Sequence, residues 1–436
     1  SVKSRGLGDV YKRQEYLYRI FFLIVIFVFD SSHDVFGREL SIQQIEERKL
    51  KDIERKKNRE QRGSKKFSKK IELTTEIVFI TKEREVPPVL SNLDPILQDE
   101  GFYGIQLAIE DNLTTGRFLG HDYNAKMILV SLEEDLESEF KKLLDQGYKY
   151  FIADLNSEEL LQIAKLSEKS QVLIMNVRSK SDSLRNEDCR SNMFHIPPSR
   201  AMLSDALTQY LIKKKWKKWF LVTGPADSDA QFSSAIKKSA KKFNVKIKEE
   251  RVWDYASDLR RTAQKEIPLF TKGVNYDVLV VSDEKGEFGE YLLYRTWKPL
   301  IVSGTQGLVP KSWHRTHEQW GATQMQNRFR RKSGRWMTEV DYSAWVGVRA
   351  IGEAISRIKN NSVLDIRKYL LSEKFGIGAY KGVKVSFRSW NGQLRQPILL
   401  AAARSMVSVS PQEGYIHPVS ELDTMGVDKP ESTCKF

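Results

Sequence analysis

Cysteine is scarce in this sequence: the 436 residues include only two, Cys189 and Cys434. They lie far apart and form no CxxC pair, so their spacing excludes a zinc ribbon and a thioredoxin-type redox site. The sequence also lacks HExxH, GxSxG and P-loop patterns, which removes the signatures of several large enzyme classes. Because no catalytic group of residues can be named, we expect a protein that is not an enzyme and that uses no cofactor.

Metal-ligand spacing occurs once, in the HxxH pair formed by His314 and His317. The pair lies in a charged, helix-like segment, where two histidines face solvent more often than they bind a metal ion. We therefore expect both side chains to face solvent and expect no metal site.

Positive charge is in excess but unevenly spread. The chain has 71 Lys and Arg against 57 Asp and Glu, a net charge of +14. Residues 46–70 hold twelve of the basic and five of the acidic residues, a surplus of seven and thus half of the net charge. A protein surface that binds the phosphate backbone of a nucleic acid needs basic residues spread over a folded face. We therefore expect no nucleic-acid partner, and we interpret Trp216 and Trp219 among lysines as a basic helix end that leads into a buried strand.

Long hydrophobic runs are absent as well. The unbroken run Ile20–Phe29 has ten residues, too few to span roughly 30 Å of hydrocarbon as a helix. Its length suits the apolar part of a secretory signal peptide, and Val35–Gly37 suits cleavage before Arg38. We expect residues 15–37 to be a signal peptide, the mature chain to be exported, and no stable membrane span to remain. The alternative is a buried strand or helix.

Two further segments precede the expected globular part. Asp9–Gln14 resembles the in-frame translation of a transposon end used in sequencing-library adapters, so residues 1–14 are excluded from fold prediction. Residues 38–72 are dominated by charged and amide side chains, with apolar positions too sparse for a core-facing stripe. We expect a charged tether or an exposed helix.

Export would place both cysteines in an oxidising compartment. Cys189 and Cys434 are then candidates for one long-range disulfide, with two unpaired thiols as the alternative.

The length predicts two or three compact units at about 100–200 residues per domain. From residue 77 onward, short apolar runs alternate with amphipathic stretches, a pattern typical of parallel sheets covered by helices. The alternation restarts after residue 211, which predicts two similar α/β units in tandem. The expected strands are 77–81, 123–130, 148–153, 171–176, 219–223, 245–250, 277–282, 300–303, 383–387 and 398–402. The expected helices are 102–113, 136–144, 160–164, 202–211, 231–243, 259–267, 285–292 and 344–358.

The segment Gly104–Gly120 resembles the first helix and turn of type I periplasmic binding proteins, the branched-chain amino acid receptor family. Gly116 and Gly120 suit a helix end and a turn, and Asn112 suits the last helical turn. Further segments resemble a subgroup labelled as ABC-transporter substrate-binding proteins of pyrroloquinoline-quinone-dependent alcohol dehydrogenase systems. These segments are 90–95, 186–190, 198–203, 304–307, 317–324, 394–400 and 408–414.

The resemblance implies an α/β fold of two Rossmann-like lobes with parallel sheets, joined by three hinge segments and closing on a small solute. The first lobe would hold residues 73–198 plus part of 308–436. The second would hold residues 199–307 plus part of 360–436.

Ligands of such sheets bind beyond the carboxyl ends of the strands, and this places the candidate ligand-binding residues. They are Ser91, Asn92, Asp154, Asn176, Arg178, Thr223, Ser282, Asp283, Glu284, Thr305 and Gln306.

The candidate site departs from amino acid receptors, which present small hydroxyl or alanine side chains where this chain has Asn176-Val177-Arg178. Arg178 in the cleft would favour an anionic solute. The alternative is that Arg178 points outward and pairs with Asp182 or Glu187.

Two functions follow from the resemblance. The first is a periplasmic solute-binding protein that serves an ABC-type permease or a quinoprotein dehydrogenase system, with an unknown small-molecule ligand. The alternative is an accessory or scaffold protein of a quinoprotein dehydrogenase system, with a vestigial cleft.

Overall fold

The computed structural model describes residues 70–84, 97–254 and 259–436, and residues 69–436 form one compact unit. The expectations for the adapter-like segment, the signal peptide and almost all of the charged tether lie outside the described residues. So do the candidate ligand-binding residues Ser91 and Asn92.

The first lobe is built on a five-stranded parallel sheet with the order β2-β1-β3-β4-β5. Successive side chains of a strand point to opposite faces, so β1 packs Phe79 against α3 and α11 and packs Ile80 against α4 and α5. Both faces are therefore covered by helices, as expected for a parallel sheet. The strands and helices are β1 (Leu73–Lys82), β2 (His121–Val130), β3 (Tyr150–Asp154), β4 (Leu173–Asn176), β5 (Met193–His195), α3 (Phe102–Leu119), α4 (Leu136–Asp145) and α5 (Ser157–Leu166).

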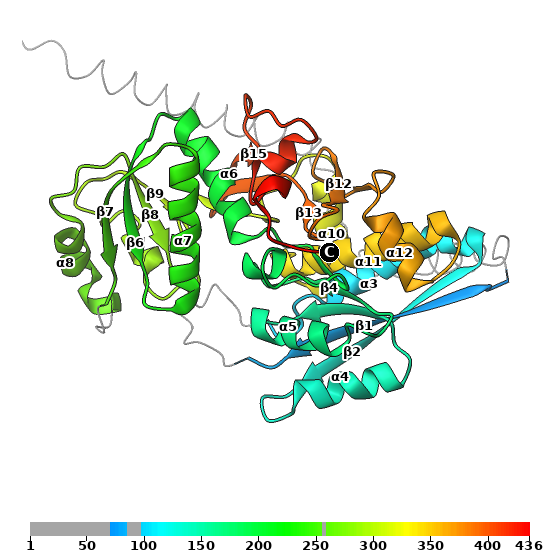
Figure 1. Cartoon of the computed structure of the whole chain (residues 1–436). Helices are drawn as coiled ribbons and strands as arrows, with labels where there is room; N and C mark the ends of the chain where they lie inside the picture. Colours follow the sequence, from blue (N-terminus) through cyan, green and yellow to red (C-terminus); the bar gives the residue numbers. More distant parts are fainter. Residues whose placement is uncertain (1–69, 85–96, 255–258) are drawn as a thin grey trace, which may run out of the picture. The chain divides into compact units, whose positions relative to one another are not determined.

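The second lobe repeats this design with a four-stranded parallel sheet of order β7-β6-β8-β9. On β6, Leu221 packs toward α6 and α7, whereas Phe220 and Val222 pack toward α8 and α9. Figure 1 shows α7 and α8 on opposite sides of this sheet. The elements are α6 (Arg200–Lys213), β6 (Lys218–Thr223), α7 (Asp227–Lys242), β7 (Lys246–Val252), α8 (Leu259–Thr271), β8 (Val278–Ser282), α9 (Gly289–Leu292) and β9 (Ile301–Gly304).

The last part of the chain adds helices to the first lobe and a small antiparallel sheet, β10-β14-β15, to the second. Its long helix α11 begins at a capping box, in which the Thr338 hydroxyl accepts from the backbone N–H of Asp341. The elements are β10 (Val309–Lys311), α10 (Ala322–Ser333), α11 (Glu339–Ile358), α12 (Val363–Leu370), β11 (Ile377–Gly378), β12 (Lys384–Phe387), β13 (Leu394–Arg395), β14 (Ile398–Ala402) and β15 (Ser405–Ser410). The 3₁₀ helices in the described part of the chain are η1 (Ser183–Arg185), η2 (Glu421–Thr424) and η3 (Lys429–Glu431).

Three short segments carry the chain between the two lobes. Ile196, Trp313 and Leu394 belong to the first-lobe core, whereas Met202, Leu308 and Ile398 belong to the second-lobe core. We name the intervening residues the crossing segments: the first is 197–201, the second 309–312 and the third 395–397. The predicted fold class, two Rossmann-like lobes with parallel sheets, is confirmed.

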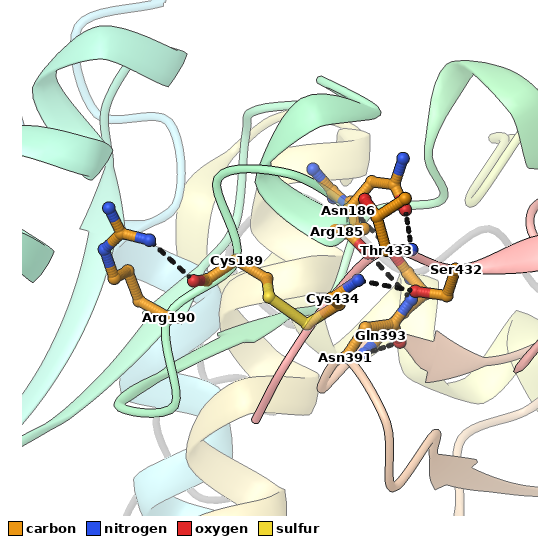
Figure 2. The surroundings of a disulfide bond; sticks show 9 residues. All are labelled: Arg185, Asn186, Cys189, Arg190, Asn391, Gln393, Ser432, Thr433 and Cys434. Carbon is orange, nitrogen blue, oxygen red and sulfur yellow. Dashed lines mark hydrogen bonds between the residues drawn. A yellow bond between two sulfur atoms is a disulfide. The ribbon is translucent and has the colours of Figure 1, made fainter.

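The C-terminal segment links both lobes again, and it ends in a disulfide. Met425 packs in the second-lobe core, while Thr433 donates its N–H to Asn186 Oδ1 in the first lobe at 2.7 Å. Cys434 then bonds to Cys189, 245 positions earlier in the chain (Figure 2). The predicted disulfide is confirmed, and the alternative of two unpaired thiols is wrong.

Two expectations for the first helix need correction. Helix α3 continues through Gly116, where a Cβ would lie 2.5 Å from the carbonyl oxygen of His121, so this glycine allows close packing and does not end the helix. Gly120 does end it, in the left-handed conformation. Asn112 is buried and donates to the carbonyl of Val348 in α11 at 3.0 Å, so it joins two helices and does not satisfy the last turn.

The helix expected at 285–292 is shorter, because residues before Gly289 form a turn. The carboxylate of Asp283 organises this turn by accepting the N–H groups of Glu287, Phe288 and Gly289. The helices α10 and α12 were not predicted, nor were the strands β5, β10, β11, β13 and β15.

Candidate ligand cleft

A cavity of about 450 Å³ lies at the carboxyl ends of strands from both lobes, and we name it the central cavity. The first lobe lines it with the start of α5, the loop after β4 and the first residue of α11. The second lobe lines it with residues of α6, α7, β9 and β10 and with the loops after β8 and β9. The lining residues are Asn156, Ser157, Arg178, Ser179, Lys180, Arg200, Leu203, Phe232, Asp283, Glu284, Gly304, Thr305, Gln306, Val309, Pro310, Lys311 and Glu339.

A second cavity, of about 460 Å³, adjoins the first, and we name it the adjoining cavity. Arg178, Lys180, Lys311 and Glu339 line both. These four residues therefore form the boundary between the two cavities.

The candidate ligand-binding residues divide into two groups within the described part of the chain. Those that line the central cavity are Arg178, Asp283, Glu284, Thr305 and Gln306. Those that do not line it are Asp154, Asn176, Thr223 and Ser282. Binding of a ligand by any of them stays a prediction.

Asp154 is an internal ion-pair partner, with an exposed fraction of 1%. Its carboxylate accepts from the guanidinium of Arg178 and from Arg84 at 2.9 Å, and from the Thr81 hydroxyl at 3.0 Å. Burial alone would raise the pKa of Asp154, but Arg178 and Arg84 hold it below its usual value. Asp154 is therefore ionised and already satisfied.

Arg178 also donates to Glu100. The alternative expectation, that Arg178 pairs with Asp182 or Glu187, is wrong, because its ion-pair partners are Glu100 and Asp154. Asp182 accepts the backbone N–H of Ala201 at 3.0 Å. Arg178 thus lines the central cavity while two carboxylates hold its guanidinium.

Asn176 is fully buried and shapes the loop after β4. Its side-chain oxygen accepts the N–H groups of Arg178 at 3.1 Å and Ser179 at 2.8 Å, and its amide nitrogen donates to the Ser179 carbonyl at 2.8 Å. These bonds fix the direction in which Arg178 leaves the strand end. Thr223 and Ser282 similarly bond to α7, through the Ser233 hydroxyl at 2.9 Å and the Asp229 carbonyl at 2.6 Å.

The second-lobe wall is a network of already satisfied polar groups. The backbone N–H of Asp283 donates to Thr305 Oγ1 at 2.9 Å, and Gln306 Nε2 donates to the Asp283 carbonyl at the same distance. Glu284 accepts two bonds from Arg200, at 3.0 Å and 2.6 Å. Arg200 is the first residue of α6, and it was missed because nothing in the strand pattern marks a helix start as part of the cleft.

At the boundary between the cavities, Glu339 pairs with Lys180 at 3.3 Å. It also accepts the N–H and hydroxyl of Ser312, at 2.7 Å and 3.0 Å. Burial would raise the pKa of Glu339, but Lys180 and Lys311 lower it to about 2, so Glu339 is ionised. Lys311 itself forms no ion pair with any described residue.

The HxxH pair departs from expectation, because His317 has an exposed fraction of only 1% and contacts the Tyr380 carbonyl through Nε2 at 2.7 Å. Among the described residues, no group of three His, Cys, Asp or Glu is placed to hold a metal ion. Within the same ranges, no helix has the length and apolar character to span a membrane.

Trp219 is buried and donates to the Trp216 carbonyl at 2.9 Å, in agreement with a basic helix end leading into a buried strand.

Comparison with known proteins identifies a family model that matches part of the chain and solved structures that share its fold. Residues 134–265 match the family model described as periplasmic binding protein. No curated protein sequence matches the chain.

Solved structures match over most of the chain. A periplasmic binding protein from Burkholderia mallei is 16% identical, with a TM-score of 0.61, covering 83% of this chain and 98% of its own. A branched chain amino acid ABC transporter periplasmic ligand-binding protein from Burkholderia xenovorans is 16% identical, with a TM-score of 0.61, covering 78% and 95%. The leucine-, isoleucine-, valine-, threonine- and alanine-binding protein from Brucella ovis, in a closed conformation, is 11% identical, with a TM-score of 0.64, covering 79% and 97%. The chain therefore has the type I periplasmic binding protein fold, and its residues 134–265 carry the sequence pattern of the periplasmic binding protein family.

Proposed function

We propose that this chain is an exported, non-enzymatic solute-binding protein that captures a small molecule in the central cavity. The observation that carries the proposal is the composition of that cavity, which takes side chains from both lobes and from the crossing segments. A solute bound there contacts both lobes at once, so it stabilises the arrangement in which the lobes close on it.

The proposed partner is an ABC-type permease, and the proposed location is the periplasm. Both are supported by the family match at residues 134–265 and by the ABC transporter ligand-binding proteins whose structures share the fold. Arg178, held by two carboxylates, stands after β4 where amino acid receptors present small side chains, so we do not propose a branched-chain amino acid as the solute.

One observation favours the second candidate, an accessory protein of a quinoprotein dehydrogenase system with a vestigial cleft. Several charged groups of the cavity already neutralise one another, including Arg200 with Glu284 and Lys180 with Glu339. Such a wall offers fewer free polar groups to a ligand than a wall with unpaired side chains.

The two candidates differ in how the purified protein responds to small molecules. A ligand that binds only the native state raises its stability by RT ln(1 + [L]/Kd), about 2.7 kcal/mol at one hundred times Kd. A thermal-shift screen of metabolite mixtures should therefore find a stabilising solute. Co-purification with a dehydrogenase and no shift with any mixture would favour the accessory role.

A further inference from the structure

The adjoining cavity has more cations than its carboxylates neutralise. Two of its cations are paired: Arg178 with Glu100, and Lys180 with Glu339 at 3.3 Å. Lys311 lines the same cavity without an ion pair among the described residues. The wall therefore carries uncompensated positive charge.

Arg315 adds a second such cation. It also lines the adjoining cavity and donates to the carbonyl of Ala403 at 3.0 Å, with no carboxylate of the described chain beside it. Lys311 is partly buried and Arg315 is exposed, so Lys311 is the less hydrated of the two and the stronger partner for a bound anion.

His314 lies between these two cations in the sequence and lines the same cavity. Burial, together with the charges of Lys311 and Arg315, lowers the pKa of His314 to about 4, so the imidazole is neutral near pH 7. Its Nδ1 contacts the N–H of Thr316 at 3.3 Å and the Thr316 hydroxyl at 2.7 Å. Because Nδ1 must accept from the backbone N–H, the proton is assigned to Nε2, which leaves a neutral donor.

Part of the lining of the adjoining cavity is apolar. Trp336 is 43% exposed and Met337 is 3% exposed, and both line the cavity beside Val340 and Trp313. The Trp313 ring is held against Tyr342, with ring centroids 4.5 Å apart and an interplanar angle of 12°. A flat apolar group can pack on such a wall.

We infer that the adjoining cavity takes the carboxylate of an aryl-carboxylate-like solute, with Lys311 as the residue that selects for negative charge. The inference rests on the proposed function, since the same solute occupies the central cavity across the boundary residues. Arg178 does not select the charge, because Asp154 and Glu100 already neutralise its guanidinium.

The test compares probes that differ in negative charge or in the presence of an aromatic ring. Benzoate is the anionic probe, benzamide is its neutral counterpart of similar shape, and acetate and inorganic phosphate supply an anion without the ring. Calorimetric titration of the purified protein should give the tightest binding for benzoate. Losing a charge-assisted hydrogen bond weakens binding about tenfold or more, so benzamide should bind at least that much more weakly.

The matched variants are Lys311→Gln, which removes one partly buried cation of the adjoining cavity, and Lys238→Gln, which removes one exposed charge on α7. Lys311→Gln should weaken benzoate binding about tenfold or more and leave benzamide binding unchanged. Lys238→Gln should change neither, and Lys311→Arg should retain most of the affinity for benzoate.

Equal binding of benzoate and benzamide, or unchanged benzoate affinity in Lys311→Gln, would overturn the inference. Tighter binding of phosphate or acetate than of benzoate would overturn the aromatic part. A neutral or cationic molecule retained by the purified protein would reject the anionic class while leaving the proposed function standing. Absence of binding to all four probes, together with no retained molecule, would reject both.

Discussion

Lys381 of the first lobe holds the backbone of the third crossing segment, because its Nζ donates to the carbonyl oxygen of Pro397 at 2.9 Å. The same ammonium group donates to the carbonyl of Ser312 in the second crossing segment. Lys381 is 2% exposed, and burial lowers its pKa to about 7. One buried lysine therefore fastens two of the three crossing segments.

The stability of the protein should depend on pH through Lys381. Its pKa is about 7 in the folded chain and about 10.4 in an unfolded one, so the unfolded state binds more protons between these values. The free energy of unfolding should therefore rise with pH from about 7 to 10, and this contribution should be flat below about 7. Denaturant unfolding measured across pH 6 to 10 tests this.

Lys381→Met should remove that pH dependence and also leave two buried carbonyl groups without a donor, which costs about 1–3 kcal/mol. The neighbouring exposed residue gives the control, Lys384→Met. An identical pH profile in Lys381→Met and the unaltered chain would show that Lys381 does not titrate in this range.

The disulfide should account for a large part of the stability. Cys189 and Cys434 close a loop of 245 positions, for which the chain-entropy model gives about 5 kcal/mol. Reduction should lower the free energy of unfolding by up to that amount, and the double variant Cys189→Ser, Cys434→Ser should be insensitive to reductant. Thiol titration of denatured, unreduced protein should detect no free thiol, and two free thiols would refute the bond.

Arg178→Met should lower the stability of the fold, although Arg178 lines the central cavity. The change leaves Asp154 buried with Arg84 as its remaining cation, so the free energy of unfolding at pH 7 should fall by about 1–3 kcal/mol. The pKa of Asp154 is lowered in the folded chain. The stabilisation that the substitution removes is therefore fully present at pH values above the pKa of an unfolded Asp, about 3.9. It is lost as the pH falls through the lower pKa of the folded state.

Denaturant unfolding at pH 7 and pH 3 measures this effect. The difference between the two proteins should shrink at pH 3. An equal stability at pH 7 would mean that Arg178 contributes nothing to the fold, and the anion-binding role predicted from the sequence would regain support.

Gly116→Ala should destabilise the protein although alanine favours helices. The added Cβ would lie 2.5 Å from a backbone oxygen of His121, and overpacking of this kind costs about 1–3 kcal/mol. Thr115→Ala, at an exposed position of the same helix, should leave stability unchanged or slightly higher. Equal melting temperatures for both variants would contradict the close packing.

The sequence was sufficient to predict most strands of the two parallel sheets, because strands buried on both faces leave short, continuous apolar runs such as 278–282. It missed the three-residue edge strand β5. It also located cavity residues that follow strands directly, such as Arg178 and Asp283. It could not tell whether a strand-end side chain faces the cavity or folds back, which is why Asn176 was placed in the cleft. The charged boundary of the cavity was missed, since Lys180, Lys311 and Glu339 meet only through the path of the crossing segments.

The central claim is that the cavity between the lobes holds a small molecule, and mass spectrometry of molecules released from freshly purified, denatured protein tests it most directly. The matched variants are Ser157→Trp, which places an indole in the central cavity, and Ser234→Trp, on the exposed face of α7. We predict one retained solute in the unaltered protein and in Ser234→Trp, and its loss from Ser157→Trp. The same released molecules from all three proteins, or none from any, would contradict the claim.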